Sequence, residues 1–220
     1  MRTSERLRKL KAWTYETLCK GREMKAPAPN FDIGQIRHTE PSVYLAWAPT
    51  RLDKMGHIIQ SDSTNVCPGI IIMPNQTYAK YTEEHRFDRY NNIQRSQEMG
   101  QHLAVSILFI VYEPGERLPG FVGHMGEQGE NLDLSLIREG TELGLFTLMD
   151  WMDDCKSALL GAKFIPETDL FVEEATMTYS LYTDQSYVVD RRPLYYGFVN
   201  VSFACYAEED NNPDINDLLN

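Results

Sequence analysis

The stretch from Leu103 to Tyr112 reads L-A-V-S-I-L-F-I-V-Y and is the longest nearly uninterrupted apolar stretch of the chain. Its odd-numbered and its even-numbered positions are both mostly apolar, so a strand here would have two apolar faces. A strand with one face in water alternates apolar and polar residues instead. A membrane-spanning helix needs about 20 apolar residues, so this stretch is too short to be one, and Ser106 interrupts it. We expect a strand that is buried on both faces at the centre of a sheet.

Further strand patterns lie on both sides of this segment. Upstream, Val43 to Ala48 and Cys67 to Met73 are short apolar runs typical of strands. Downstream, alternation predicts two half-buried strands, Phe171 to Thr183 and a later one near the end of the chain, which we expect to be antiparallel neighbours. The alternating residues are Ala175, Met177, Tyr179 and Leu181, and then Val199, Val201, Phe203 and Cys205.

Two segments have the periodicity of amphipathic helices. Ser4 to Lys20 precedes Gly21, which stands where a helix C-cap belongs, and Glu139 to Leu160 precedes Gly161, which we expect to end that helix over one side of the sheet. The first stripe consists of Leu7, Leu10, Thr14 and Leu18, flanked by Trp13 and Tyr15, and the second of Leu145, Leu148, Met152, Cys155 and Leu159. The cationic face of the first helix consists of Arg2, Arg6, Lys9 and Lys20. This face could meet an acidic neighbour, but exposure to solvent is the simpler interpretation.

These patterns predict an α+β fold, in which a mostly antiparallel sheet with long loops is covered by helices. Residues 1–30 are expected to form the amphipathic helix and a proline-rich arm, because Ala26-Pro-Ala-Pro29 favours extended backbone. Residues 31–207 are expected to form a single α+β domain, and residues 208–220 an acidic, disordered tail. A helix on such an arm can pack on its own domain or reach a neighbour.

Three long connections contain aromatic side chains, most of which lie in the first and the third. Pro74 to Gly100 is expected to be functional or hairpin-forming, Glu113 to Asn131 to be a flexible loop or hairpin tip, and Asp184 to Gly197 to join the two closing strands. Aromatic residues are common anchors at protein interfaces, although they can equally cover the domain's own core. The candidate subunit-interface residues are Tyr78, Tyr81, Phe87, Tyr90, Phe121, Tyr195 and Tyr196.

The charge is strongly acidic, at a formal −11, and it is unevenly distributed. Basic residues outnumber acidic ones over residues 1–25, whereas residues 208–220 have acidic residues and no basic one. An acidic body argues against wrapping nucleic acid, since phosphate binding needs clustered Lys and Arg. It would suit a surface that DNA passes without sticking, or it could simply provide solubility.

The sequence has no strong signal for catalysis or for a cofactor. Phosphate-binding loops, nucleophile elbows and zinc motifs are absent, and the beginning of the chain does not resemble a secretory signal. We expect no catalytic, cofactor-binding or metal-binding residue, and a protein made in the cytoplasm with free core thiols at Cys19, Cys67, Cys155 and Cys205. The acidic residues Asp150, Asp153 and Asp154 are interpreted as a solvated helix face. The best enzymatic alternative pairs Cys155 or Cys67 with one of His57, His85, His102 and His124.

Three segments together resemble the tail terminator, or tail completion, proteins of tailed bacteriophages. They are Val105 to Glu113 (V-S-I-L-F-I-V-Y-E), the helix Leu145 to Leu160, and Arg192 to Phe203 (R-P-L-Y-Y-G-F-V-N-V-S-F). The order of elements, with an N-terminal helix and arm, strands with long loops, a covering helix and two closing strands, resembles that family too. The similarity is one of pattern over Val43 to Tyr206, and the two longer connections exceed what a minimal member requires.

The resemblance implies a structural virion protein that forms a six-membered ring, caps the finished end of the tail tube, stops its polymerisation and joins tail to neck. Its partners would be its own copies, the tail tube protein, neck or connector proteins and the sheath, with DNA passing through the lumen without specific binding and no membrane involved. Three alternatives stay open: a neck or head-tail connector protein, a small Cys/His enzyme, and a cytosolic adaptor.

Overall fold

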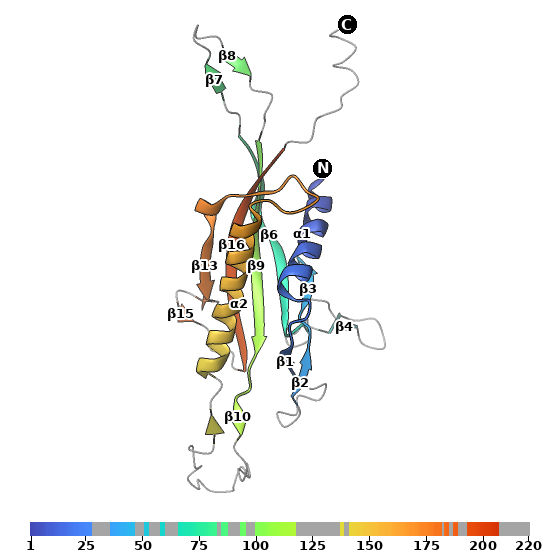
Figure 1. Ribbon diagram of the computed structural model, residues 1–220, viewed down its shortest axis with the longest axis vertical. Coiled ribbons are helices and arrows are strands. Elements are labelled where there is room, and N and C mark those ends of the chain that lie inside the picture. The colour runs from blue at the N-terminus through green and yellow to red at the C-terminus, as the bar shows by residue number, and fades with distance from the viewer. Residues whose placement is uncertain are drawn as a thin grey trace.

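A central mixed sheet organises the molecule. The computed structural model describes residues 1–27, 36–46, 51–52, 58–59, 66–82, 85–87, 93–95, 100–117, 137–138, 141–181, 183–184, 187–188 and 193–206. The six-stranded sheet has the order β12-β16-β9-β6-β3, and β13 also pairs with β16 (Figure 1). Its strands are β3 (Ser42–Leu45), β6 (Gly69–Thr82), β9 (Gly100–Tyr112), β12 (Phe171–Val172), β13 (Thr178–Leu181) and β16 (Leu194–Tyr206). Only the β3–β6 pair among these is parallel, so the expected α+β class with a mostly antiparallel sheet is confirmed.

Strand β9 occupies the middle of this sheet, as its two apolar faces predicted. It pairs with β16 along its whole length, from Gly100 opposite Tyr206 to Tyr112 opposite Leu194. Its other edge pairs with β6, with a register shift between Pro74 and Ala79. The flanking strands therefore leave β9 no free edge.

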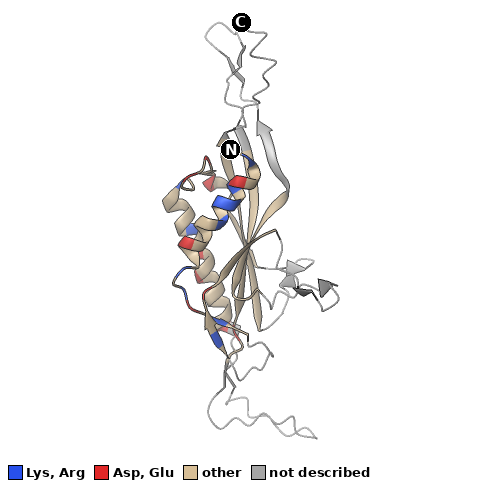
Figure 2. Ribbon diagram, turned by 90° about the vertical axis from the view of Figure 1, so that its right-hand side faces the viewer, with Lys and Arg blue, Asp and Glu red and all other residues tan. Residues whose placement is uncertain are grey.

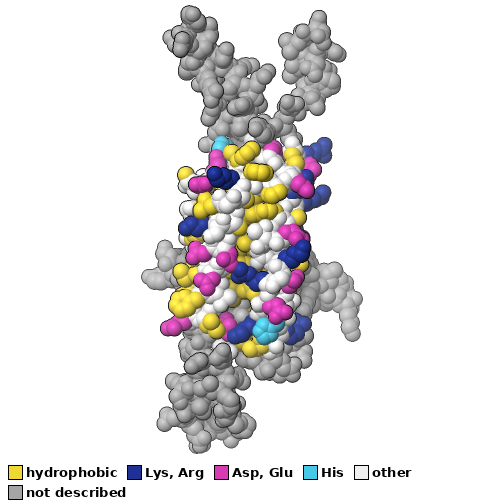
Figure 3. Space-filling view, in the orientation of Figure 1, with side chains coloured by type: hydrophobic (Ala, Val, Ile, Leu, Met, Phe, Trp, Pro, Cys, Tyr) yellow, Lys and Arg dark blue, Asp and Glu magenta, His cyan; other side chains and the backbone are white. Residues whose placement is uncertain are grey.

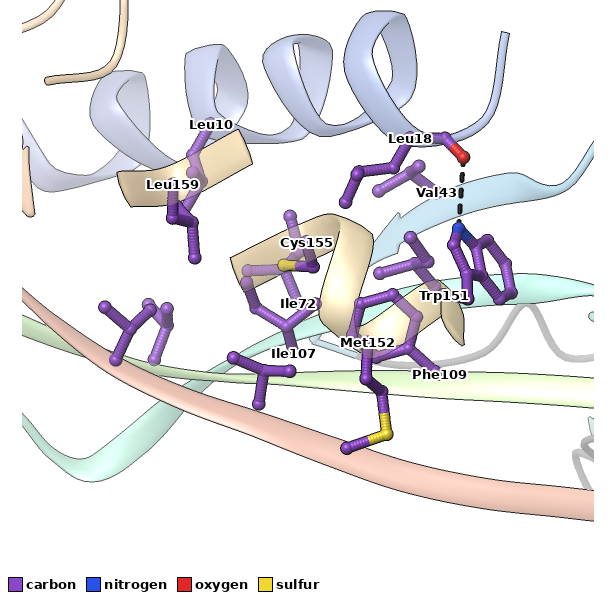
Figure 4. Packing of buried hydrophobic residues seen from close by; sticks show 14 of the residues in the cluster. Leu10, Leu18, Val43, Ile72, Ile107, Phe109, Trp151, Met152, Cys155 and Leu159 are labelled. Atoms are coloured by element: carbon purple, nitrogen blue, oxygen red, sulfur yellow. Dashed lines mark hydrogen bonds between the residues drawn. The ribbon is translucent and has the colours of Figure 1, made fainter. Parts of the chain in front are cut away.

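Two helices, α1 (Thr3–Leu18) and α2 (Thr141–Ala162), cover the same face of the sheet (Figure 2). Between helices and sheet lies the main core, in which the indole of Trp151 meets the ring of Phe109 edge to face at 5.2 Å and donates a hydrogen bond to the carbonyl of Leu18 at 3.0 Å (Figure 4). The predicted stripe of α2 is buried here: Leu148, Met152, Cys155 and Leu159 are buried and Leu145 is half-buried. Helix α1 thus packs on its own domain.

The opposite face of the sheet carries a smaller apolar cluster. Val66, Cys67, Ile71, Ile110 and Tyr112 are buried there. Strand β9 contributes to both clusters because its side chains alternate between the two faces.

Arg6 corrects one expectation about α1. It was placed on a solvated cationic face, but its side chain is fully buried and binds Asp169 through two hydrogen bonds, Nε to Oδ1 at 2.9 Å and Nη2 to Oδ2 at 2.5 Å. Asp169 follows α2 in the chain, so this charge pair fastens the N-terminal helix to a segment 163 residues away. A buried guanidinium needs such a partner, which the helical periodicity of α1 does not show.

Several connections contain short antiparallel pairs. These are β1 (Met24–Ala26) with β2 (Arg37–Thr39), β4 (Arg51–Leu52) with β5 (Ile58–Ile59), β7 (His85–Phe87) with β8 (Ile93–Arg95), β10 (Glu116–Arg117) with β11 (Ile137–Arg138), and β14 (Thr183–Asp184) with β15 (Tyr187–Val188). The extended backbone expected around Ala26 is therefore the end of a paired strand. The connection after Pro74 is a hairpin, one of its two expected forms, because β6 and β9 continue their pairing to Thr82 opposite Gly100.

Other predicted boundaries were wrong. Gly161 lies inside α2, which ends at Ala162 before Lys163 adopts the left-handed region at φ 57°. The strand expected over Phe171 to Thr183 is broken by a 3-10 turn, η3 (Glu174–Thr176), and Tyr179 is exposed rather than half-buried. The predicted connection to Gly197 is shorter than expected, since β16 begins at Leu194.

Among the described residues, no helix is long and apolar enough to cross a bilayer. The tail 208–220 and most of the Glu113 to Asn131 connection lie outside the described residues.

Candidate subunit interface

The predicted interface residues Tyr195 and Tyr196 belong to β16 rather than to a connection. Tyr195 lies opposite Val111 and packs against the main core under α2, whereas Tyr196 lies opposite Ile110 and packs against the smaller cluster. Both are half-buried and face opposite sides of the sheet, as neighbours in a strand must. They cover the domain's own core, so the structure does not bring them together into one patch.

The remaining predicted residues cannot be placed as side chains. Tyr78 and Tyr81 lie within strand β6, and Phe87 lies within β7, but their side chains are outside the described part of the chain. Tyr90 and Phe121 lie outside the described residues altogether. Their role at an interface stays a prediction.

A different apolar surface lies on the outer face of α2, and sequence reasoning missed it. Leu143, Phe146 and Met149 are 46%, 56% and 48% exposed. Their spacing of three residues places them along one face of the helix, and their exposure shows that this face is not the buried one. Figure 3 shows hydrophobic side chains gathered where the first turns of α2 lie, at the lower left of this face. The sequence did contain a signal for this surface, namely a second set of apolar residues beside the main stripe of the helix.

Carboxylates surround this apolar surface. Glu142, Asp150 and Asp153 are exposed, and no described cation lies within ion-pair distance of them. Asp154, by contrast, pairs with Arg22 on the side of α2 that faces α1. The expectation of a solvated acidic face therefore holds for Asp150 and Asp153. We call the exposed residues Leu143, Phe146, Met149, Asp150 and Asp153 the α2 outer face.

Helix α1 carries the corresponding excess of cations. Most basic side chains of residues 1–25 are neutralised within the chain: Arg6 by Asp169, Lys9 by Glu167, Lys20 by Glu16, Arg22 by Asp154 and Lys25 by Glu113. Arg8 and Lys11 have no ion-pair partner among the described residues. They lie three residues apart, on one flank of the helix with Tyr15. We call Arg8, Lys11 and the exposed Ala12 between Arg8 and Tyr15 the α1 flank.

The cysteines are all free and buried, which confirms the expectation of core thiols. Burial raises the pKa of Cys19 and of Cys155 to about 12, and it raises the pKa of Cys67 and Cys205 as well. Reactive thiols need the opposite, a lowered pKa and access to solvent. These thiols therefore pack as small apolar side chains.

The histidines proposed as partners for Cys155 do not meet it in the described part of the chain. His102 has the opposite parity to Leu103 in β9, so it projects from the face of the sheet opposite α2 and Cys155, and its Nδ1 lies 2.8 Å from Oε1 of Glu173. His57 and His124 lie outside the described residues, and the side chain of His85 is not described. No group of three or more His, Cys, Asp or Glu residues within the described ranges is placed to hold a metal ion.

No protein-family model matches the chain, and no curated protein matches its sequence.

Proposed function

We propose that this chain is a structural virion protein of the tail terminator type, which forms a ring that caps the end of a phage tail tube, ends tail polymerisation and joins the tail to the neck. Six copies would form the ring, as the resemblance implies. The ring would contact the tail tube, neck or connector proteins and the sheath, and would let DNA pass through without binding a sequence.

The observation that carries this proposal is the packing of the three segments on which the resemblance rests. Val105 to Tyr112 lies in β9, Leu194 to Phe203 lies in the neighbouring strand β16, and α2 lies across both. These segments, far apart in sequence, pack together into one structural unit of this chain, and that packing supports the proposal.

A surface suited to subunit contacts adds support. An apolar stripe on a helix, bordered by charges, is typical of a protein interface, whereas isolated exposed apolar side chains are ordinary. The α2 outer face has three such side chains in consecutive turns.

The enzyme alternative has less support. Its preferred nucleophile, Cys155, is fully buried with a raised pKa, and its one described histidine candidate, His102, lies on the other side of the sheet. The connector alternative uses the same kind of ring and is distinguished only by position in the virion.

Negative-stain electron microscopy tests the proposal. The purified chain is mixed with tail tubes from a phage lacking its own terminator, over a range of concentrations, and tubes alone give the number of bare ends. We expect six-fold rings, capped tube ends and tubes that stop growing. Chains that bind head or portal particles but never a tube end would favour the connector, and particles that bind neither would contradict both assembly roles.

A further inference from the structure

Two surfaces of opposite charge lie at opposite sides of this molecule. The flank of α2 that carries Met149 and Asp153 faces the β13 edge of the sheet, because Lys156 on the same flank lies 5.4 Å from the ring of Tyr179 in β13. The flank of α1 that carries Arg8 and Lys11 faces the β3 edge, because Tyr15 on that flank donates a hydrogen bond to Glu40, which precedes β3. Figure 1 shows α2 with β13 on one side and α1 with β3 on the other.

The spacing of the charges on the two helices also matches. Arg8 and Lys11 are three residues apart on α1, and Asp150 and Asp153 are three residues apart on α2. Three residues advance a helix by about 4.5 Å, so two helices lying side by side can form both ion pairs at once, in either direction. The aliphatic stems of Arg8 and Lys11 would then lie over the exposed apolar side chains of α2.

We propose that the α1 flank of one copy of this chain docks on the α2 outer face of a second copy. The proposal rests on the assembly role above and names the surfaces that would join one subunit to the next. The occupant is a second copy because this chain itself supplies the complementary cations, and because its own α1 cannot reach the α2 outer face: Arg6 and the indole of Trp151 hold α1 on the other side of α2.

Such a contact has a definite symmetry. It joins two different surfaces, so it is heterologous, and repetition of the contact gives a closed ring if the rotation between copies closes. A two-fold dimer would instead place the same surface of both copies together. The two symmetries can be distinguished with the purified chain alone, without tail proteins.

Cross-linking of variants that each carry one introduced cysteine separates these arrangements. The native thiols are buried, so a bis-maleimide reagent will react with cysteines introduced at Ala12→Cys and Met149→Cys, both exposed positions without charge. We expect no cross-linked product from either variant alone, a product of two chains from the mixture, and a ladder from the double variant. The wild-type chain, treated alike, gives the background.

Three results would overturn the contact. Efficient cross-linking of Met149→Cys alone would mean that α2 meets α2. Self-association without a product from the mixture would place the interface elsewhere. A chain that stays monomeric at the highest attainable concentration and gives no cross-linked product would show that the contact does not form.

Charge reversal provides an independent test. Asp153→Lys and Lys11→Asp should each weaken self-association in sedimentation velocity by about tenfold, and the double variant should recover to within about threefold of wild type. Glu23→Lys makes the same change of net charge as Asp153→Lys, at an exposed site outside both surfaces, so it is the matched control for that variant and should have no effect. If the double variant associates no better than the singles, the two side chains do not meet.

The two proposals can fail separately. Tube capping without an α1 to α2 cross-link would retain the terminator role and remove this contact. The cross-link without capping would retain the contact between copies and remove the terminator role.

Discussion

Arg6 holds the N-terminal helix to the rest of the domain through a buried charge. Its guanidinium is out of solvent and pairs with the carboxylate of Asp169. Replacing one partner of a buried pair leaves the other charge uncompensated, so we expect Arg6→Met to lower the free energy of unfolding by about 3 kcal/mol in urea titrations. Arg6→Met with Asp169→Leu should recover part of this loss. A single variant as stable as the wild type would mean that the pair does not form.

The same pair predicts a dependence on pH. Partial burial by itself would raise the pKa of Asp169, but the hydrogen bonds and charge of Arg6 outweigh it and lower the pKa below its ordinary value. The unfolded chain therefore binds more protons in acid, and stability that is complete above about pH 4 is lost as the pH falls through the lowered native pKa.

The Asp169→Asn variant isolates this effect. Glu40 also has a lowered pKa, through the Gly21 amide and Tyr15, so the wild-type slope contains more than one group. We expect the difference in stability between wild type and Asp169→Asn to shrink between pH 5 and pH 2. A difference that does not vary with pH would contradict the lowered pKa.

Cys155 tests the choice between a core thiol and a nucleophile. Because its side chain fills part of the main core, Cys155→Ala should lower the free energy of unfolding by about 1 to 3 kcal/mol and leave self-association and tube capping unchanged. Ser157→Ala, at an exposed position of the same helix, is the control and should change little. Loss of function with unchanged stability would instead favour catalysis.

At the scale of elements, α2 contains two glycines in opposite situations. A Cβ on Gly144 would lie 2.3 Å from Cε2 of Tyr195, so the helix packs directly on a rigid ring, whereas a Cβ on Gly161 would meet nothing within 4 Å. Alanine favours helix over glycine by about 1 kcal/mol. We expect Gly161→Ala to raise the melting temperature and Gly144→Ala to lower it, and calorimetry of both variants would show whether the contact or the propensity dominates at residue 144.

Periodicity predicted the elements better than their ends. The buried stripe of α2 was correct because burial against a flat sheet repeats every three to four residues. Trp151 was missed because it lies at the edge of that stripe and turns toward α1, a neighbour that the pattern within α2 does not reveal. Strands β6 and β16 extend beyond their predicted limits because pairing with β9 continues through residues such as Lys80, opposite His102, and Gly197, opposite Phe109.

The candidate interface was less predictable than the fold. Aromatic content cannot distinguish a side chain that covers its own core from one that awaits a partner, and Tyr195 and Tyr196 proved to do the former. Leu143, Phe146 and Met149 look in sequence like part of an unusually apolar helix. Only the position of the sheet separates the buried stripe from the exposed one.

At the scale of the whole molecule, α1 is part of the main core and does not merely lie on its surface. Leu10 and Leu18 are buried in the main cluster, and Trp151 depends on the carbonyl of Leu18 for its hydrogen bond (Figure 4). We expect a chain that begins at Glu23 to lose its sharp cooperative unfolding transition. Arg8→Ala, at an exposed position of α1, should change stability by no more than about 0.5 kcal/mol. Cooperative unfolding of the shortened chain would mean that the sheet and α2 suffice.

The anchoring of α1 also has a consequence for biosynthesis. This helix leaves the ribosome well before its charge partner, because Asp169 follows Arg6 by 163 residues. At about 5 to 20 residues per second, Arg6, Leu10 and Leu18 wait roughly 10 to 30 seconds before the groups that bury them have been synthesised. During that interval a cationic, amphipathic helix is available to chaperones, so its burial can be completed only after Asp169 has been synthesised.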